Sequence, residues 1–435
     1  MLSRPAMRSA AHNFGWLVGE KAVRFAFGVG VGIWLARHLG PVRLGTLGYC
    51  TALVTLFGFA PSLGLDAVVK RDLLQMPDRT SELLVSSFVL RICAGMASYG
   101  ILLILAFGGW GLTEEEARLL IIFSLMLFQP GLLVPDLWLQ VQLRAKLSVI
   151  VQLLVLAIGS ALRVWLILDD ASLAAFAWVA VVEMMLCGVG IFTVSRWSGL
   201  SVSRSAARFV TMKRLLAEAW PLMFASFAIG VYMKIDEVML RQLAGPAVVG
   251  IYSAAVKLSE IWYFLPVALG ASVLPALLRA RASDEAVYAH RQQQYYDISA
   301  AAAYILSVPI ALVAPKLINL TYGLDYAAAG PILAVHIWSS VFVFIGVARG
   351  QWLVNEGLQK FYLAATLAGA GANVMLNLVL IPRLGGLGAA WATVLSYAFA
   401  AWIASYLHPA VRATARMQTL ALLIPFRGWS YLRRR

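Results

Sequence analysis

The sequence predicts an all-α integral membrane protein with twelve transmembrane helices. Hydrophobic residues make up 61% of the 435-residue chain and charged residues only 13%, whereas soluble domains average about half and about a quarter. The apolar runs extend from one end of the chain to the other, and most are close to the ~20 residues that one helical crossing needs. They do not alternate with polar residues as the strands of a membrane barrel would.

These runs place the helices in order along the chain. We expect the first six at 13–37, 44–64, 83–108, 116–139, 147–168 and 172–195, and the second six at 215–240, 248–276, 296–314, 331–352, 360–381 and 386–407. The predicted domains are an N-terminal six-helix lobe (1–195), a basic cytoplasmic linker (196–214), a C-terminal six-helix lobe (215–407) and a basic cytoplasmic tail (408–435).

The distribution of Lys and Arg supports this count. If the N-terminus is cytoplasmic, 22 of the 35 basic residues fall on the inner side and 6 on the outer side, and the rest lie within spans. The positive-inside rule then favours cytoplasmic N- and C-termini. The net charge of +14 is therefore a topology signal, and it argues against nucleic-acid binding.

A weak internal repeat relates the two lobes. A Trp, a helix end, a Gly-Pro turn, a Gly and a Tyr occur in the same order twice, at Trp16, Leu35–Pro41, Gly45 and Tyr49 and again at Trp220, Leu240–Pro246, Gly250 and Tyr252. Six predicted helices separate the copies, so both lobes have the same orientation. This parallel design is typical of transporters whose substrate path lies between two halves.

Ionisable residues inside the predicted spans are the candidate site residues, because each costs about 2.5–3.5 kcal/mol unless it faces a cavity or a partner. The candidates for substrate binding are the cations Arg24, Arg91, Arg163, Lys234, Lys257 and Arg349. The candidates for ion coupling or ion pairing are Glu20, Glu183, Asp236, Glu237 and Glu260. One interpretation is a partly cationic, water-filled cavity for a phosphate or pyrophosphate. The alternative is ion pairing that only fixes helix register.

Signals for enzyme chemistry are absent from the sequence. It contains no GxxxxGK[ST], HExxH or GxSxG motif, and its histidines lack metal-ligand spacing. Cys50, Cys93 and Cys187 lie in apolar runs without paired spacing, so we expect neither disulfides nor metal ligands. The outer loops are too short for the external catalytic domain that a membrane polymerase would need. We therefore predict a non-enzyme without a resident cofactor.

Three stretches resemble the polysaccharide-biosynthesis branch of the multidrug/oligosaccharidyl-lipid/polysaccharide exporter superfamily, which includes the O-antigen flippases. The first comprises Leu35–Pro41, Gly45, Leu63–Asp66 and Arg71; the second Lys234–Asp236, Gly250–Ala255 and Lys257–Glu260; the third Ile381–Thr393. Together they cover both lobes. The twelve predicted helices distinguish the chain from the fourteen-helix peptidoglycan-precursor flippases of the same superfamily.

The resemblance implies two six-helix lobes in a MATE-like inverted V around a cationic cavity. It implies a flippase that moves a polyprenyl-pyrophosphate-linked oligosaccharide, an O-antigen or exopolysaccharide unit, across a bacterial cytoplasmic membrane by alternating access. Such proteins are thought to use a Na⁺ or H⁺ gradient, and a polysaccharide polymerase and export machinery would be partners. Head-group contact is implied for Arg24, Arg91 and Lys257, and acidic pairing or coupling for Glu20, Asp236 and Glu183.

Two other functions stay open at this point. A cation-coupled drug antiporter of the same fold would have a net acidic, aromatic cavity, whereas the buried charges here favour a cationic one. A membrane polymerase or ligase acting on the same lipid-linked sugars would need external catalytic residues, which the short outer loops do not provide.

Overall fold

The computed structural model describes residues 4–108, 110–203 and 207–427, and side chains from Phe27 onward apart from positions 221, 225, 275 and 283. Helices dominate these ranges, and no strand occurs in them. In a bilayer a helix satisfies its own backbone hydrogen bonds, so apolar runs without water must adopt this form. The predicted all-α membrane fold is confirmed.

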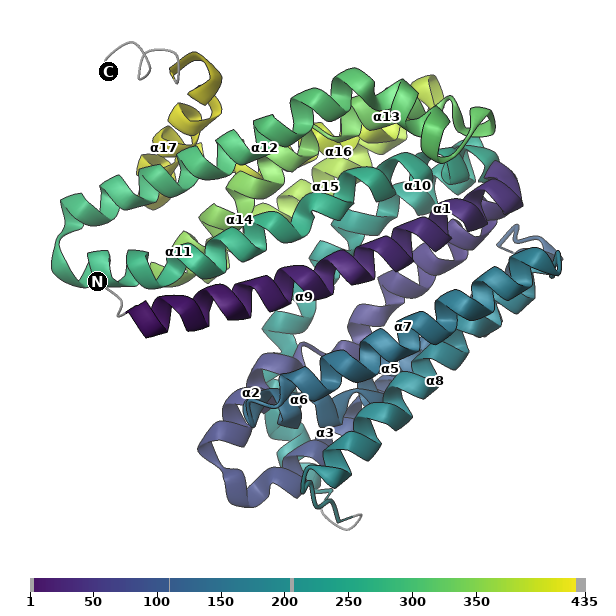
Figure 1. Ribbon diagram of the computed structural model, residues 1–435, viewed down its shortest axis with the longest axis horizontal. Coiled ribbons are helices and arrows are strands. Elements are labelled where there is room, and N and C mark those ends of the chain that lie inside the picture. Colours follow the sequence, from purple (N-terminus) through teal and green to yellow (C-terminus); the bar gives the residue numbers. More distant parts are fainter. Residues whose placement is uncertain (1–3, 109, 204–206, 428–435) are drawn as a thin grey trace. The chain divides into compact units, whose positions relative to one another are not determined.

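The helix count agrees with the sequence once two breaks are considered. Among the described residues, ten segments are long and apolar enough to cross a membrane, and a pair bent by 52°, Phe209–Trp220 with Leu222–Ala244, adds an eleventh. A proline at position 221 lies at that bend. The segment Phe27–Gln75 counts as one of the ten but contains non-helical Gly40, where the chain reverses (Figure 1). Counting its two arms separately brings the total to twelve.

The chain forms two compact units. Unit 1 comprises residues 1–39 and 49–230, and unit 2 comprises residues 40–48 and 231–435. The boundary lies inside α9 (Phe209–Ala244), and the short segment 40–48 packs with unit 2.

Unit 1 contains most of α1 and seven further helices before α9. Their bounds are α1 (Arg4–Ser62), α2 (Leu65–Gln75), α3 (Thr80–Phe107), α4 (Glu114–Ser124), α5 (Gln129–Leu132), α6 (Val134–Val141), α7 (Ala145–Leu168) and α8 (Leu173–Trp197). The fourth crossing is thus assembled from α4, a 3₁₀ turn, α5 and α6. A capping box begins it, because Thr113 Oγ1 accepts from the Glu116 amide (3.2 Å) and Glu116 Oε2 accepts from the Thr113 amide (2.9 Å).

Unit 2 contains the end of α9 and eight further helices. They are α10 (Pro246–Glu260), α11 (Phe264–Ser283), α12 (Glu285–Thr321), α13 (Ala329–His336), α14 (Ser339–Asn355), α15 (Gln359–Leu384), α16 (Gly386–Ala401) and α17 (Arg412–Leu422). α17 lies within the predicted tail and packs against α12, where Thr414 contacts the Tyr296 hydroxyl at 2.8 Å and the Leu422 carbonyl accepts from Tyr304 at 3.0 Å.

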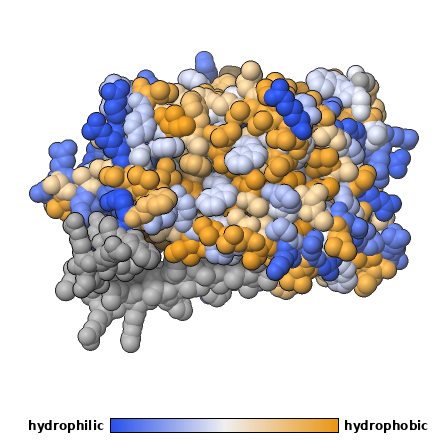
Figure 2. Space-filling model, turned by 90° about the horizontal axis from the view of Figure 1, so that it is seen from above, coloured by the Kyte–Doolittle hydropathy of each residue, from blue (hydrophilic) through white to orange (hydrophobic). Residues whose placement is uncertain are grey.

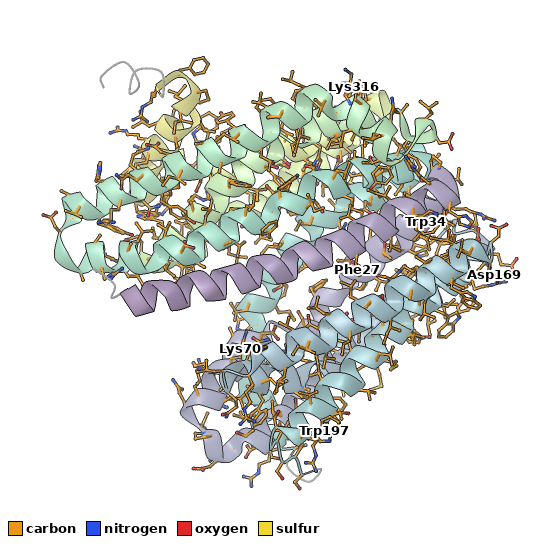
Figure 3. The ribbon with its side chains drawn as sticks, in the orientation of Figure 1. Phe27, Trp34, Lys70, Asp169, Trp197 and Lys316 are labelled. Atoms are coloured by element: carbon orange, nitrogen blue, oxygen red, sulfur yellow. The ribbon has the colours of Figure 1, made fainter. Side chains whose placement is uncertain are left out.

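The surface shows the pattern expected of a membrane protein. The face in Figure 2 carries hydrophobic side chains across its middle, and hydrophilic side chains gather toward two ends. In unit 1, Lys70 and Trp197 lie toward one end and Asp169 at the other (Figure 3). The chain is therefore a multi-pass membrane protein, and in unit 1 these polar connections lie at opposite ends of the helices.

Both copies of the sequence repeat form the same turn. Gly40 (φ 71°, ψ 172°) and Gly245 (φ 89°, ψ 170°) adopt matching left-handed conformations, each followed by a proline that starts a helical arm. In unit 2 the two arms pack closely: a Cβ at Gly45 would collide with the carbonyl of Pro246, and one at Gly250 with the carbonyl of Pro41. The repeat thus encodes a pair of reciprocal backbone contacts.

Candidate functional site

The strongest candidate site lies in unit 2 around Asp236, whose residue exposure is only 4%. α9 carries this carboxylate into contact with α10, α15 and α16. It accepts hydrogen bonds from Asn377 Nδ2 (2.5 Å), Thr393 Oγ1 (2.6 Å) and the Tyr252 hydroxyl (2.7 Å). All three donors are neutral. The carboxylate is therefore solvated by dipoles, and within the described ranges no Lys or Arg nitrogen forms an ion pair with it.

The amides around Asp236 form a second layer on α15. Asn373 and Asn377 are both fully buried, and Asn377 Nδ2 also lies 3.1 Å from Asn373 Oδ1. Asn377 Oδ1 is buried without a hydrogen-bond partner among the described residues. The cluster therefore offers several oxygens, from a carboxylate, a hydroxyl and amides, in a small volume. Such hard oxygen ligands suit a proton or an alkali cation.

Sequence reasoning singled out Asp236 but missed the two asparagines. Their spacing carried a signal, because Asn373 and Asn377 are i and i+4 in the apolar middle of α15 and so share one face. Polar amides on one face of a membrane helix indicate a partner inside the bundle. Thr393 and Tyr252 lie within two of the stretches that carry the family resemblance, but the sequence assigned them no role.

Other predicted acidic and basic residues surround this cluster. Lys234 Nζ lies 2.7 Å from Glu237 Oε1, and Glu237 is 6% exposed. Glu260, at the end of α10, interacts electrostatically with both side chains. Unit 2 therefore brings Lys234, Asp236, Glu237 and Glu260 together, with three acids and one base. Lys257 is exposed on α10.

Arg349 occupies a separate position in unit 2. Its residue exposure is 2%, Nη1 donates to Ser405 Oγ at 3.1 Å, and the guanidinium lies 6.0 Å from the centre of the Phe361 ring. Its Nε is buried without a hydrogen-bond partner, and no carboxylate pairs with it in the described part of the chain. Arg349 is thus a buried cation held by a hydroxyl and an aromatic ring.

Two predicted cations in unit 1 form ion pairs. Arg91 (3% exposed) donates from Nη2 to Asp66 Oδ1 at 2.5 Å and from Nη1 to the Pro130 carbonyl at 3.0 Å. The latter bond satisfies a carbonyl where the fourth crossing is broken. Arg163 and Glu183 form a two-pronged pair at 2.5 and 2.7 Å, and the Glu183 carboxylate packs directly on Gly159.

Two of the predicted site residues, Glu20 and Arg24, have side chains outside the described residues. In the described part of the chain no disulfide joins Cys50, Cys93 or Cys187, and Cys93 is exposed. The structure thus gathers the acids of α9 and α10 into one cluster and distributes Arg91, Arg163 and Arg349 over separate positions.

Comparison with known protein families finds a match over more than half of the chain. Residues 10–281 match the model of the family described as "Polysaccharide biosynthesis protein". A segment covering 38% of this chain is 29% identical, over 175 residues, to "Probable flippase AglR" of Haloferax volcanii. The match spans 35% of that protein's length.

Solved structures share the fold. The inward-facing form of a multidrug resistance MATE family transporter of the MOP superfamily aligns with a TM-score of 0.70, at 16% identity, over 92% of this chain and 95% of that one. The inward closed form of the lipid II flippase MurJ aligns with a TM-score of 0.66, at 15% identity, over 96% and 92%. At these identities the likeness establishes the fold only.

Proposed function

Because the chain belongs to the polysaccharide biosynthesis protein family, we propose that it is a flippase for polyprenyl-pyrophosphate-linked oligosaccharide, coupled to a cation gradient. Its substrate would be an O-antigen or exopolysaccharide unit that passes from the inner to the outer leaflet of a bacterial cytoplasmic membrane. The partial match to a flippase and the membrane fold support this assignment.

The observation that carries the coupling proposal is the Asp236 cluster. Burying a carboxylate without a counter-charge is costly, and a bound proton or Na⁺ removes that cost. Asp236, Thr393, Asn377 and Tyr252 belong to four different helices, α9, α16, α15 and α10. A cation bound there would hold these helices together. It can drive transport only if it binds one conformation of the protein more tightly than the other.

Two cations of unit 2, Lys257 and Arg349, are the best candidates for contact with the pyrophosphate. Arg349 has no carboxylate partner in the described ranges, so it need not exchange one for an anion. Lys257 is exposed on α10 and is therefore accessible to a head group. Arg91, Arg163 and Lys234 would have to exchange Asp66, Glu183 and Glu237 for the head group. We therefore propose Lys257, Arg349 and Arg24 as head-group contacts, with Arg24 retained from its position in the sequence.

Proteoliposomes that contain a fluorescent lipid-linked oligosaccharide test this function. We expect translocation that depends on an imposed Na⁺ or H⁺ gradient, and the two gradients applied separately identify the ion. Asp236→Asn keeps the shape of the side chain but removes its charge, so we expect the gradient to lose its effect. Asp325→Asn, an exposed acid in the same unit, is the matched control and should transport normally.

Two results would contradict the proposal. If the wild-type chain moved no lipid-linked sugar under any gradient but exported organic cations, it would be a drug antiporter. If Asp236→Asn retained full dependence on the gradient, the cluster would have no part in coupling.

A further inference from the structure

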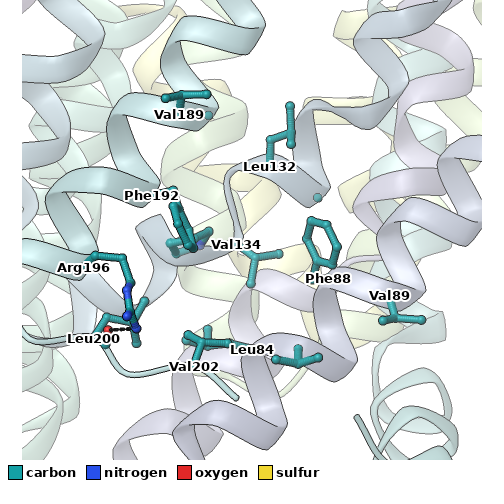
Figure 4. A pocket seen from close by; sticks show the side chains of 14 residues that line it. Leu84, Phe88, Val89, Leu132, Val134, Val189, Phe192, Arg196, Leu200 and Val202 are labelled. Carbon is teal, nitrogen blue, oxygen red and sulfur yellow. Dashed lines mark hydrogen bonds between the residues drawn. The ribbon is translucent and has the colours of Figure 1, made fainter. Parts of the chain in front are cut away.

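Unit 1 contains a deep apolar groove outside the charged sites. A cavity of about 840 Å³ lies among α3, the broken fourth crossing, α8 and the irregular stretch 200–202 that follows α8 (Figure 4). Leu84 and Val134 are buried in its walls, whereas Phe88, Val189 and Phe192 are 41–64% exposed. The groove is thus open along one side and has the size of a small-ligand pocket, roughly 300–1,000 Å³.

The break in the fourth crossing explains why the groove exists. Pro130 lies in the first turn of α5 and Pro135 in the first turn of α6, and neither has a backbone N–H to continue the helix from the preceding segment. The crossing is therefore broken beside α3 and α8. Two glycines of the lining let α5 pack closely against its neighbours: a Cβ at Gly131 would collide with Ile92 on α3, and one at Gly188 on α8 would press on Leu132. The contact from Arg91 to the Pro130 carbonyl helps to hold the break in place.

One end of the groove is cationic. Arg196 is the charged residue of the lining, and its Nη1 donates to the Leu200 carbonyl at 3.0 Å. No carboxylate pairs with it in the described ranges. Figure 4 shows Arg196 beside Leu200 at one end, with Val189 and Leu132 toward the other. The next residue, Trp197, is 85% exposed, as expected of an aromatic anchor at the membrane interface.

An apolar groove with a cation at one end favours an amphiphilic ligand, which has an apolar chain and an anionic head group. Bilayer chains cover every apolar face equally well, so an apolar groove alone prefers no particular lipid. A fixed cation at the interface adds preference for a phosphate, and Val189 to Arg196 along α8 gives a path of about 10 Å for a chain. The charge at one end and the apolar length together match a lipid phosphate whose chain enters the groove.

We propose that this groove binds the polyprenyl chain of the lipid-linked substrate beside its phosphate, with Arg196 as the phosphate contact. The proposal rests on the proposed flippase function and extends it to the lipid tail. The sugar-bearing head would then be presented near the cationic end, while the tail stays in unit 1 instead of the open bilayer.

Photocrosslinking tests the occupant directly. The full chain, with benzoylphenylalanine in place of Phe192, is placed in nanodiscs of phosphatidylcholine and phosphatidylglycerol with labelled polyprenyl phosphate. We expect a crosslink to polyprenyl phosphate that excess phosphatidylglycerol does not displace. A crosslink that phosphatidylglycerol displaces completely would overturn the proposal, since the groove would then hold ordinary lipid.

Substitutions test the two parts of the groove. Val189→Trp fills the apolar length, and we expect it to abolish the crosslink; Val182→Trp, on the same helix but outside the groove, should leave it intact. Arg196→Gln should lower polyprenyl phosphate affinity about ten-fold, the loss of one charge-assisted hydrogen bond, and Arg196→Lys should restore most of it. Unchanged affinity in both Val189→Trp and Arg196→Gln would overturn the proposal.

The same proteins, assayed for translocation, separate this inference from the proposed function. If the wild-type chain binds polyprenyl phosphate in the groove but flips no lipid-linked sugar, the flippase proposal fails and the groove stands. If it flips the sugar and Val189→Trp flips it equally well without a crosslink, the groove proposal fails and the flippase stands.

Discussion

At the scale of single residues, the buried charges fall into two physical classes. Arg91, Arg163 and Lys234 each have a carboxylate partner within 2.7 Å, so the membrane interior sees nearly neutral pairs. Asp236 and Arg349 have only neutral partners in the described ranges. A paired charge stabilises a fixed structure, whereas a charge solvated by dipoles retains an affinity for an ion. The second class is therefore where ion and substrate chemistry is expected.

Arg91→Ala tests this distinction at a paired residue. The substitution leaves the Pro130 carbonyl and Asp66 without their donor, and we expect it to destabilise unit 1 by about 2–3 kcal/mol. Asp66 is 62% exposed and regains water, so the loss should not reach the value of a fully buried pair. Thermal unfolding in detergent measures the effect. An unchanged melting temperature together with lost transport would instead make Arg91 a head-group contact.

At the scale of elements, the repeat explains why glycine occupies four positions. Gly40 and Gly245 allow the left-handed turns between helical arms, and Gly45 and Gly250 allow the following arms to pack backbone to backbone. Gly45, on the arm after Gly40, lies against the Pro246 carbonyl, and Gly250, on the arm after Gly245, lies against the Pro41 carbonyl. A contact made by backbone atoms cannot adjust as a flexible side chain would.

Gly45→Ala should therefore destabilise the packing of the segment 40–48 in unit 2. The added methyl group meets the Pro246 carbonyl, and overpacking of this kind costs about 1–3 kcal/mol. Gly58→Ala is the matched control, since a Cβ at Gly58 meets nothing within 4 Å and the helix gains a better helix former. Thermal unfolding of both variants decides the matter. Equal melting temperatures would show that the arms separate without cost.

The broken fourth crossing is the second element with a clear consequence. Its interruption creates the groove of unit 1 and requires Arg91 to satisfy a freed carbonyl. The apolar run at 116–139 gave no sign of this break beyond its prolines, because hydropathy measures the length of a span and not its continuity.

At the scale of the whole molecule, orientation follows from the basic residues of the connections. The 22-to-6 asymmetry predicts cytoplasmic termini, with the loop around Asp78 inside and the loop around Glu115 outside. In a variant without its native cysteines, Glu115→Cys should react with an impermeant maleimide added outside intact cells. Asp78→Cys should react only after the membrane is opened. The reverse pattern would invert the topology.

The site shows why sequence reasoning stopped where it did. Asp236 was found because a charge in an apolar helix is conspicuous by itself. Its partners could not be identified in this way, because Asn377 lies 141 residues and Thr393 157 residues from Asp236 in the sequence. A neutral polar residue in a membrane helix also has many structural uses, so it does not by itself indicate a site. The pairing of Arg163 with Glu183 was equally invisible until α7 and α8 were packed together.

The sequence by itself determined the fold class, the twelve crossings and the repeated turns. These are local properties, because about twenty apolar residues must form a helix in lipid and a Gly-Pro pair sets its own backbone. Only the tertiary structure decided which buried charges are paired, where Asp236 finds its donors and where a groove opens beside Arg196. Those outcomes depend on contacts between helices far apart in the chain, which no run of residues specifies alone.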